Sequence, residues 1–147
     1  MKPVIATFFF ITALASQAVA DVAGSVRSIE TELQLCLAQP ENETTMGMNT
    51  CLHNALHAAD ELQNTEYMKL LDLIENPVVR DRLEKSQEAW VLYRTAQGSV
   101  EAAAMLGGSG EMTLILSAEY EITKRRIFEV EDLRSSLIDP FGSTKSK

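Results

Sequence analysis

Apolar side chains recur at intervals of three and four residues along most of the chain, which places them on one face of an α-helix. This pattern predicts helices over residues 25–38, 44–75, 78–106 and 111–138. Pro40, the Asn76–Pro77 pair and the glycines of 107–110 interrupt it, since proline removes a backbone donor and glycine favours turns. No strand-like alternation is longer than chance would give. We therefore predict an all-α protein, an antiparallel bundle of about four helices.

Each predicted helix has an apolar face that should turn toward a shared core. The residues on these faces are Val26, Ile29, Leu33 and Leu37; Met48, Leu52, Leu56, Ala59, Leu62, Met68, Leu71 and Ile74; Leu83, Trp90, Tyr93, Ala96 and Val100; and Leu114, Ala118, Ile122, Phe128 and Leu133. Trp90 shares its stripe with Leu83 and Tyr93, so we expect it to be largely buried against the second and fourth helices. The break between the first two helices is short, which predicts a helical hairpin there.

The first twenty residues have the composition of a secretory signal peptide. Lys2 precedes an apolar run from Val4 to Leu14, and residues 18–20 read Ala-Val-Ala, the small-x-small pattern of a cleavage site. A membrane anchor is the alternative, but the run is shorter than the roughly 20 residues that span a bilayer. We predict a signal peptide over 1–20, one helical domain over 21–138 and a disordered tail over 139–147. The mature protein is then periplasmic or secreted, without a membrane anchor.

The chain is acidic, with 13 lysines and arginines against 21 aspartates and glutamates. Lys2 is the only charged residue of the leader, so the mature chain keeps 12 basic side chains and has a net charge of −9. This charge argues against nucleic acid as a partner, because phosphates need a basic surface, and against an anionic membrane. It favours a basic protein partner through faster encounter. The alternative is that the charge only keeps an exported protein soluble.

Cys36 and Cys51 are the only cysteines of the chain. An even number of cysteines in an exported protein predicts a disulfide, and the hairpin formed by the first two helices would bring this pair together. Closing a loop of about 16 residues should stabilise the fold by roughly 3 kcal/mol. The alternatives are two free thiols or half of a metal site, although the spacing does not resemble that of zinc ligands.

The sequence contains no motif typical of an enzyme. His53 and His57 have the spacing of a zinc-binding helix, but Asn54 stands where that motif needs glutamate, so solvated histidines are the simpler interpretation. The glycine run at 107–110 lacks the lysine and hydroxyl residue of a phosphate-binding loop, and no nucleophile elbow is present. We therefore predict a non-enzyme without a cofactor or a metal.

A series of polar and aromatic residues interrupts the apolar faces of the helices. They are Asp60, Asn64 and Tyr67; Gln87, Trp90, Tyr93 and Arg94; and Thr123 and Arg126. One interpretation is structural: an inter-helix hydrogen-bond network in which Arg94 or Arg126 reaches the carboxylate of Asp60, because a buried charge needs a partner. The other is an exposed patch of aromatic residues and arginine, which are enriched at binding hot spots. We favour the structural interpretation.

Together with the first cysteine pair, these residues resemble the signature of the LprI-like lysozyme-inhibitor domain, a family of small exported helical proteins. The resemblance extends from Cys36 to about Leu133. It rests on Cys36, the segment 48–51, Ala59 with Asp60, Asn64, Tyr67, Gln87, Trp90, Tyr93 with Arg94, the glycine turn, and Thr123 with Arg126. The order and spacing of these motifs together carry the resemblance.

The chain departs from this family pattern in two respects. Gln63 stands where the family usually has leucine. The family also commonly has a second cysteine pair, and the corresponding positions here are Gly98 and Ala118. Loss of both partners together is what a lost disulfide should look like, and it leaves the joint between the third and fourth helices to packing alone.

The resemblance implies an exported binding protein rather than an enzyme. One branch of the family is associated with inhibiting lysozyme, and many relatives have no known activity. An acidic exported domain suits a basic lysozyme, so lysozyme inhibition is the leading hypothesis. The alternative is a periplasmic interaction or assembly module that binds another envelope protein or a cell-wall fragment.

Overall fold

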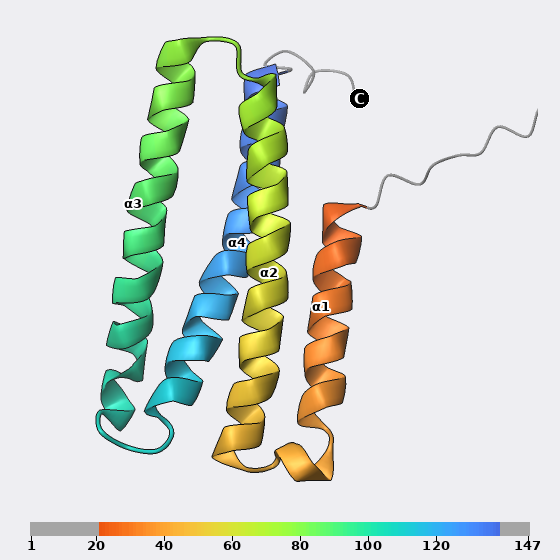
Figure 1. Cartoon of the computed structure of the whole chain (residues 1–147), viewed down its shortest axis with the longest axis vertical. Helices are drawn as coiled ribbons and strands as arrows, with labels where there is room; N and C mark the ends of the chain where they lie inside the picture. Colours follow the sequence, from red (N-terminus) through yellow and green to blue (C-terminus); the bar gives the residue numbers. More distant parts are fainter. Residues whose placement is uncertain (1–20, 139–147) are drawn as a thin grey trace, which may run out of the picture.

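The computed structural model describes residues 21–138, and these residues form helices and turns without a strand. The α-helices are α1 (Val22–Leu37), α2 (Thr45–Leu73), α3 (Pro77–Glu101) and α4 (Glu111–Ile138), with short 3₁₀ segments η1 (Pro40–Asn42) and η2 (Ala102–Met105) (Figure 1). The prediction of an all-α protein with four helices is confirmed. The predicted signal peptide and tail lie outside the described residues.

Local signals in the sequence set the beginnings of the first three helices. The Asp21 carboxylate accepts a hydrogen bond from the backbone of Ala23, and the Thr44 hydroxyl accepts one from Gly47 at 3.1 Å. The Asn76 side chain accepts from Val78 at 2.9 Å, with proline at the first helical position. Such caps satisfy amide donors that a helix end otherwise leaves unpaired. Each cap lies within three residues of the amide it serves, so the sequence predicted the starts of α2 and α3 closely, whereas α1 begins at Val22, three residues before the predicted start.

The glycine turn between α3 and α4 requires one glycine for its backbone conformation. Gly107 has a φ of 72°, the left-handed region that glycine enters without steric cost. The sequence predicted that the third helix would continue to residue 106, but the α-helix ends at Glu101 and tightens into η2 before this turn. Tightening of a last turn into 3₁₀ geometry is common at helix ends.

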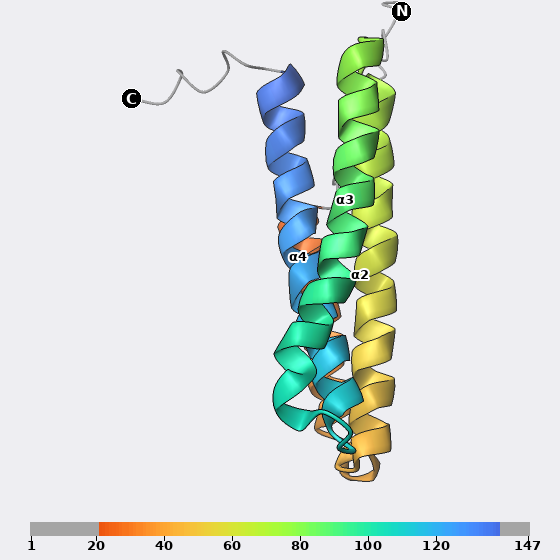
Figure 2. The same ribbon diagram turned by 90° about the vertical axis from the view of Figure 1, so that its left-hand side faces the viewer.

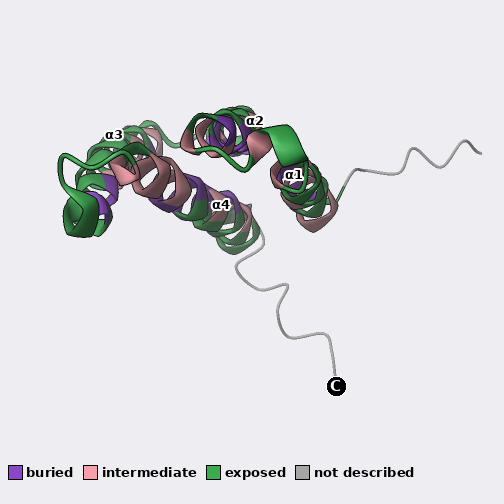
Figure 3. Cartoon of the chain, turned by 90° about the horizontal axis from the view of Figure 1, so that it is seen from below, coloured by how far each residue is buried: buried purple, intermediate pink, exposed green. Residues whose placement is uncertain are grey.

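Helices α2 and α4 form the centre of the bundle, with α1 and α3 on opposite sides of this pair (Figure 3). Helices that follow one another in the chain are antiparallel, as predicted, so the central pair α2 and α4 runs in the same direction (Figure 1). Figure 2 shows that α2, α3 and α4 all extend along the length of the molecule. The bundle is flattened, because α3 packs mainly against α4 and not against the α2 that precedes it.

Two apolar clusters make up the core. One lies between α1, the first half of α2 and α4, and includes Leu33, Leu56 and Ile127. The other lies at the opposite end, between the second half of α2, the start of α3 and α4, and includes Leu70 and Val130. Burial of this apolar surface is the main force that holds the four helices together.

Helix α3 contributes little to this core, which corrects part of the sequence prediction. Its fully buried residues are Leu83 and Gly98, whereas Tyr93, Ala96 and Val100 are exposed. The predicted core residues Met68 and Phe128 are exposed as well. At the edge of a flattened bundle a helix is covered on one side only, so a wide apolar stripe is not buried across its full width.

The disulfide between Cys36 and Cys51 is present, as predicted, and joins the end of α1 to the first half of α2. The loop that it closes is tightly packed. The side chain of Asn42 donates to the carbonyl of Cys36 at 2.9 Å, and a Cβ at Gly47 would come within 2.4 Å of the Asn42 backbone. Glycine is therefore needed where α2 begins.

Candidate functional site

Three residues of the predicted polar set meet near the middle of the bundle. Asp60 projects from α2, Arg94 from α3 and Thr123 from α4. One amino group of Arg94 donates to the Asp60 carboxylate and also to the Thr123 hydroxyl, the latter at 3.0 Å, and that hydroxyl lies 3.4 Å from the same carboxylate. An arginine contact to Asp60 was expected, and Arg94 provides it.

A second group of polar side chains lies one to two helical turns closer to the start of α3. Gln87 donates to the buried Gln63 of α2 at 3.1 Å and accepts two hydrogen bonds, each 3.3 Å, from Arg126 of α4. Arg126 also pairs with Glu129 at 3.1 Å. Arg126 therefore contacts Gln87 and not Asp60. Arg94 joins α3 to α2 and α4 through Asp60 and Thr123, and Arg126 joins α4 to α3 through Gln87.

Trp90 lies between these two groups, and its surroundings differ from those expected. Its ring is partly buried, and it faces guanidinium groups: that of Arg94 is 5.1 Å from the ring centroid and that of Arg126 is 5.7 Å. Both distances fall within the range of a cation–π contact. Trp90 is therefore part of the polar joint between α3 and α4: most of its surface is covered, but guanidinium groups and not only apolar side chains cover it.

The remaining residues of the predicted set lie apart from this network. Tyr67 is buried in the apolar cluster with Leu70, and this burial, followed by the nearby carboxylate of Glu84, raises the pKa of its phenol above the usual 10.0. Asn64 and Tyr93 are exposed. The structure therefore brings together six of the nine polar and aromatic residues: Asp60, Gln87, Trp90, Arg94, Thr123 and Arg126.

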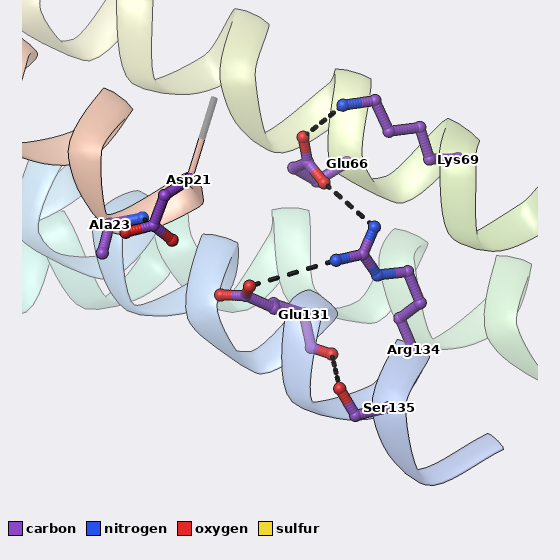
Figure 4. Close-up of polar contacts among 7 residues, drawn as sticks. All are labelled: Asp21, Ala23, Glu66, Lys69, Glu131, Arg134 and Ser135. Atoms are coloured by element: carbon purple, nitrogen blue, oxygen red, sulfur yellow. Dashed lines mark hydrogen bonds and ion pairs between the residues drawn. The ribbon is translucent and has the colours of Figure 1, made fainter. Parts of the chain in front are cut away.

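A buried glutamate forms a further ion pair that the sequence analysis did not identify. Glu66 on α2 is 5% exposed, and its carboxylate lies between Lys69, at 2.7 Å, and Arg134 of α4, at 4.0 Å (Figure 4). Glu131 approaches the same arginine at 3.9 Å. The spacing of Glu66 and Lys69 was visible in the sequence, but their partner lies on another helix, so only the fold could reveal the cluster.

Lys124 and Tyr120 form another contact on α4. Lys124 pairs with Glu30 of α1 at 2.7 Å and with Glu121, and its ammonium lies 5.4 Å from the Tyr120 ring. Burial by itself lowers the pKa of Lys124, and the hydrogen bonds to the two carboxylates more than offset this, so the pKa is raised. Burial also raises the pKa of Tyr120, whose hydroxyl has no hydrogen-bond partner among the described residues.

An open groove of about 640 Å³ lies near the glycine turn, between the first turns of α2 and α4. Its lining is mostly apolar and includes Met46, Asn49, His53, Met112 and Leu116. The hydroxyl of Thr113 and the side-chain oxygen of Asn49, 2.6 Å apart, connect the two helices beside it. Nothing in the sequence points to Met46 or Met112, because neither belongs to a motif.

The two histidines are separate features of α2. His53 lines this groove and His57 lies 3.8 Å from Glu61, and both are exposed, as the interpretation of solvated histidines requires. No set of three or more histidine, cysteine or carboxylate side chains in residues 21–138 is arranged to hold a metal ion. In the same range, no helix has the length and apolar character needed to cross a membrane.

Most polar groups of the network are paired within the chain, although Arg94 Nε and Gln63 Nε2 are buried with no hydrogen-bond partner among the described residues. Each arginine is paired with a carboxylate or an amide of the same chain, and Thr123 is fully buried. Such an arrangement positions helices, because a buried charge that loses its partner destabilises the fold. The groove near the glycine turn has room for another molecule.

Comparison with known proteins agrees with this description. The family model described as lysozyme inhibitor LprI matches residues 36–130, which is more than half of the chain. An uncharacterized protein of Rhizobium meliloti (strain 1021) is 25% identical over 127 residues, covering 71% of this chain and 91% of that protein. No solved structure matches. The matched residues contain the disulfide, the polar network and the glycine turn, and the chain belongs to the LprI lysozyme inhibitor family.

Proposed function

We propose that this protein is an exported, non-enzymatic inhibitor that binds lysozyme. The observation that carries the proposal is the match of the LprI lysozyme inhibitor family to residues 36–130. The leader over residues 1–20 supports export, and a disulfide suits an oxidising compartment. The net charge of −9 after cleavage supports a basic protein partner.

We propose further that the polar residues of the family signature act through the fold rather than by contacting the partner. Arg94, Thr123 and Arg126 are bonded to other helices of the same chain, which supports this role. Their part in binding is then indirect: they fix α3 against α4 and so keep the surface of the bundle in one shape. Asn64 and Tyr93 are exposed and remain available for contact.

The direct test measures whether the purified protein slows the clearing of a cell-wall suspension by a basic lysozyme. We expect the clearing rate to fall as the protein is titrated and to level off at a one-to-one ratio for a tight complex. An equal amount of a neutral or acidic protein of similar size serves as the control for crowding. An unchanged clearing rate at low salt would overturn the proposal.

A second candidate is a module that binds another envelope protein or a cell-wall fragment. The groove of about 640 Å³ favours it, because a groove of that size accepts a side chain or a small fragment whatever its source. A pull-down from periplasmic extract distinguishes the two candidates, since it recovers the partner without assuming its identity. Recovery of a lysozyme supports inhibition, and specific recovery of another envelope protein supports the module.

A further inference from the structure

The charges of this protein are segregated along the bundle. Asp60 and Arg94 meet near its middle, and from that level to the glycine turn the chain comprises residues 28–59 and 95–122. These two stretches, which we call the acidic end, contain no lysine or arginine. They contain eight carboxylates: Glu30, Glu32, Glu41, Glu43, Glu101, Glu111, Glu119 and Glu121.

Most of these carboxylates are not neutralised by the rest of the protein. Among the described residues, Lys124 pairs with Glu30 and Glu121, and the other six have no cationic partner. The two stretches are far apart in the sequence, and folding brings them to the same end of the bundle, the lower end in Figure 1. Outside the acidic end, the mature chain is close to neutral, with 13 acidic and 12 basic side chains.

The groove near the glycine turn opens at this same end. Met46 is 81% exposed and Met112 is 51% exposed, and both line it. Leu106, on the adjoining turn, is 79% exposed. Large apolar side chains gathered on an exposed surface are typical of an interaction site, and methionine adapts its shape to the side chain that it meets.

We propose that the acidic end is the surface that contacts lysozyme, an inference that rests on the proposed lysozyme inhibition. A basic surface segment of the enzyme lies across it, and an apolar side chain of that segment enters the groove between Met46 and Met112. The negative charge of the acidic end favours a basic protein as the partner, because unpaired carboxylates attract a cationic surface and repel an anionic membrane. The methionines supply the apolar contact that slows dissociation.

The charge arm of the test compares two reversals that change the net charge equally. Glu43 lies at the acidic end, in the loop before α2, and Glu75 lies in the loop after α2, at the opposite end; both are exposed. The association rate with a basic lysozyme is measured at low salt. We expect Glu43→Lys to slow association about fivefold or more and Glu75→Lys to slow it less than about twofold, since steering acts where the surfaces meet.

The apolar arm uses methionines of similar exposure. Met112 is 51% exposed in the groove, and Met68 is 45% exposed on the second half of α2. We expect Met112→Ala, alone or with Met46→Ala, to weaken lysozyme binding about tenfold, as the loss of a central contact does. Met68→Ala should change it less than about twofold. Unchanged helix content and melting temperature in every variant show that folding is not the cause.

The outcomes separate this proposal from the function on which it rests. If the wild-type protein binds lysozyme and the variants at the two ends behave alike, the acidic end is not the contact surface and inhibition stands. If the charge variants differ but Met112→Ala and Met68→Ala do not, the role given to the groove is wrong. If the wild-type protein does not bind lysozyme at low salt, both proposals fall.

Discussion

Single side chains decide how α3 is held in this bundle. Few apolar residues of α3 are buried, and Arg94 instead reaches across to Asp60 on α2 and Thr123 on α4. Hydrogen bonds to charged groups contribute about 1.5–3 kcal/mol each when they are protected from water. The Arg94 side chain is 17% exposed and that of Asp60 is 41% exposed, so solvent screening reduces the contribution of this pair.

Arg94→Ala should therefore destabilise the protein by about 1–3 kcal/mol and affect binding only indirectly. The expected loss comes from the hydrogen bonds that Arg94 makes to Asp60 on α2 and to Thr123 on α4, which the substitution removes. Denaturant unfolding followed by circular dichroism measures it. Arg82→Ala is the matched control, because Arg82 is an exposed arginine on the same helix. Equal stability of the two variants would contradict a structural role for Arg94.

Three buried or partly buried groups make stability sensitive to alkaline pH. The pKa values of Tyr67 and Tyr120 are raised from 10.0 and that of Lys124 from 10.5. The folded protein holds these protons more tightly than the unfolded chain does. Their contribution to stability is thus complete below about pH 10 and is lost as pH rises through the raised pKa values of the folded state.

We expect the melting temperature to fall steeply above about pH 10, and to fall less steeply in the double variant Tyr67→Phe with Tyr120→Phe. Tyr120→Phe alone should be neutral or stabilising at neutral pH, because its buried hydroxyl has no partner in residues 21–138. Thermal unfolding across the alkaline range tests both statements. Equal slopes for the wild type and the double variant would show that these phenols do not carry the effect.

Among the helices, the hairpin of α1 and α2 is the part that a covalent bond secures. The Cys36–Cys51 disulfide joins α1 to α2, whereas α2, α3 and α4 are held by packing and by the polar network. Reduction should lower the melting temperature, consistent with a loss of roughly 3 kcal/mol, and leave the helix content nearly unchanged at 25 °C. Circular dichroism with and without reductant measures both. A large loss of helix on reduction would mean that the other helices depend on this bond.

Helices α3 and α4 approach each other closely where the resemblance to the family placed a missing second disulfide. A Cβ at Gly98 would lie 3.1 Å from Glu119 and 3.6 Å from the carbonyl of Ile115, and Ala118 between them is buried. Because the family pattern places a cysteine pair at these two positions, we expect Gly98→Cys with Ala118→Cys to form a disulfide and to stabilise the protein by at most about 3 kcal/mol, since Glu119 must shift to make room. Thiol counting and melting temperature in oxidising buffer test this, with Gly98→Cys alone as the control. Free thiols in the double variant would contradict the alignment of these positions.

Across the molecule, uneven charge should govern how fast a basic partner associates. Long-range attraction acts before contact and is screened when the Debye length shortens to about 8 Å at physiological ionic strength. For lysozyme binding we expect the association rate to fall steeply with salt while the dissociation rate changes little. Charge reversal at Glu41 and Glu43 should flatten this salt dependence without altering the fold. Association that is insensitive to salt would contradict electrostatic steering.

The sequence by itself determined the features that depend on neighbouring residues or on chain composition. The starts of α2 and α3 follow from the caps at Thr44 and Asn76, and the four helices follow from the three-to-four spacing of apolar residues. The Cys36–Cys51 bond followed from the cysteine count and the short break between two helices. These signals are local, so they can be recognised in the sequence without knowledge of how the helices pack.

Only the tertiary structure decided which helix surfaces meet. An apolar stripe shows where a helix is apolar but not which neighbour will cover it, so the exposure of Tyr93 and the charged surroundings of Trp90 could not be predicted. The network members were visible in the sequence, yet the choice of Arg94 for Asp60 depends on how α3 packs against α4 at the edge of the bundle. The acidic end likewise exists only in the folded chain, because it joins two stretches that are separated by more than thirty residues and that meet only when the helices pack.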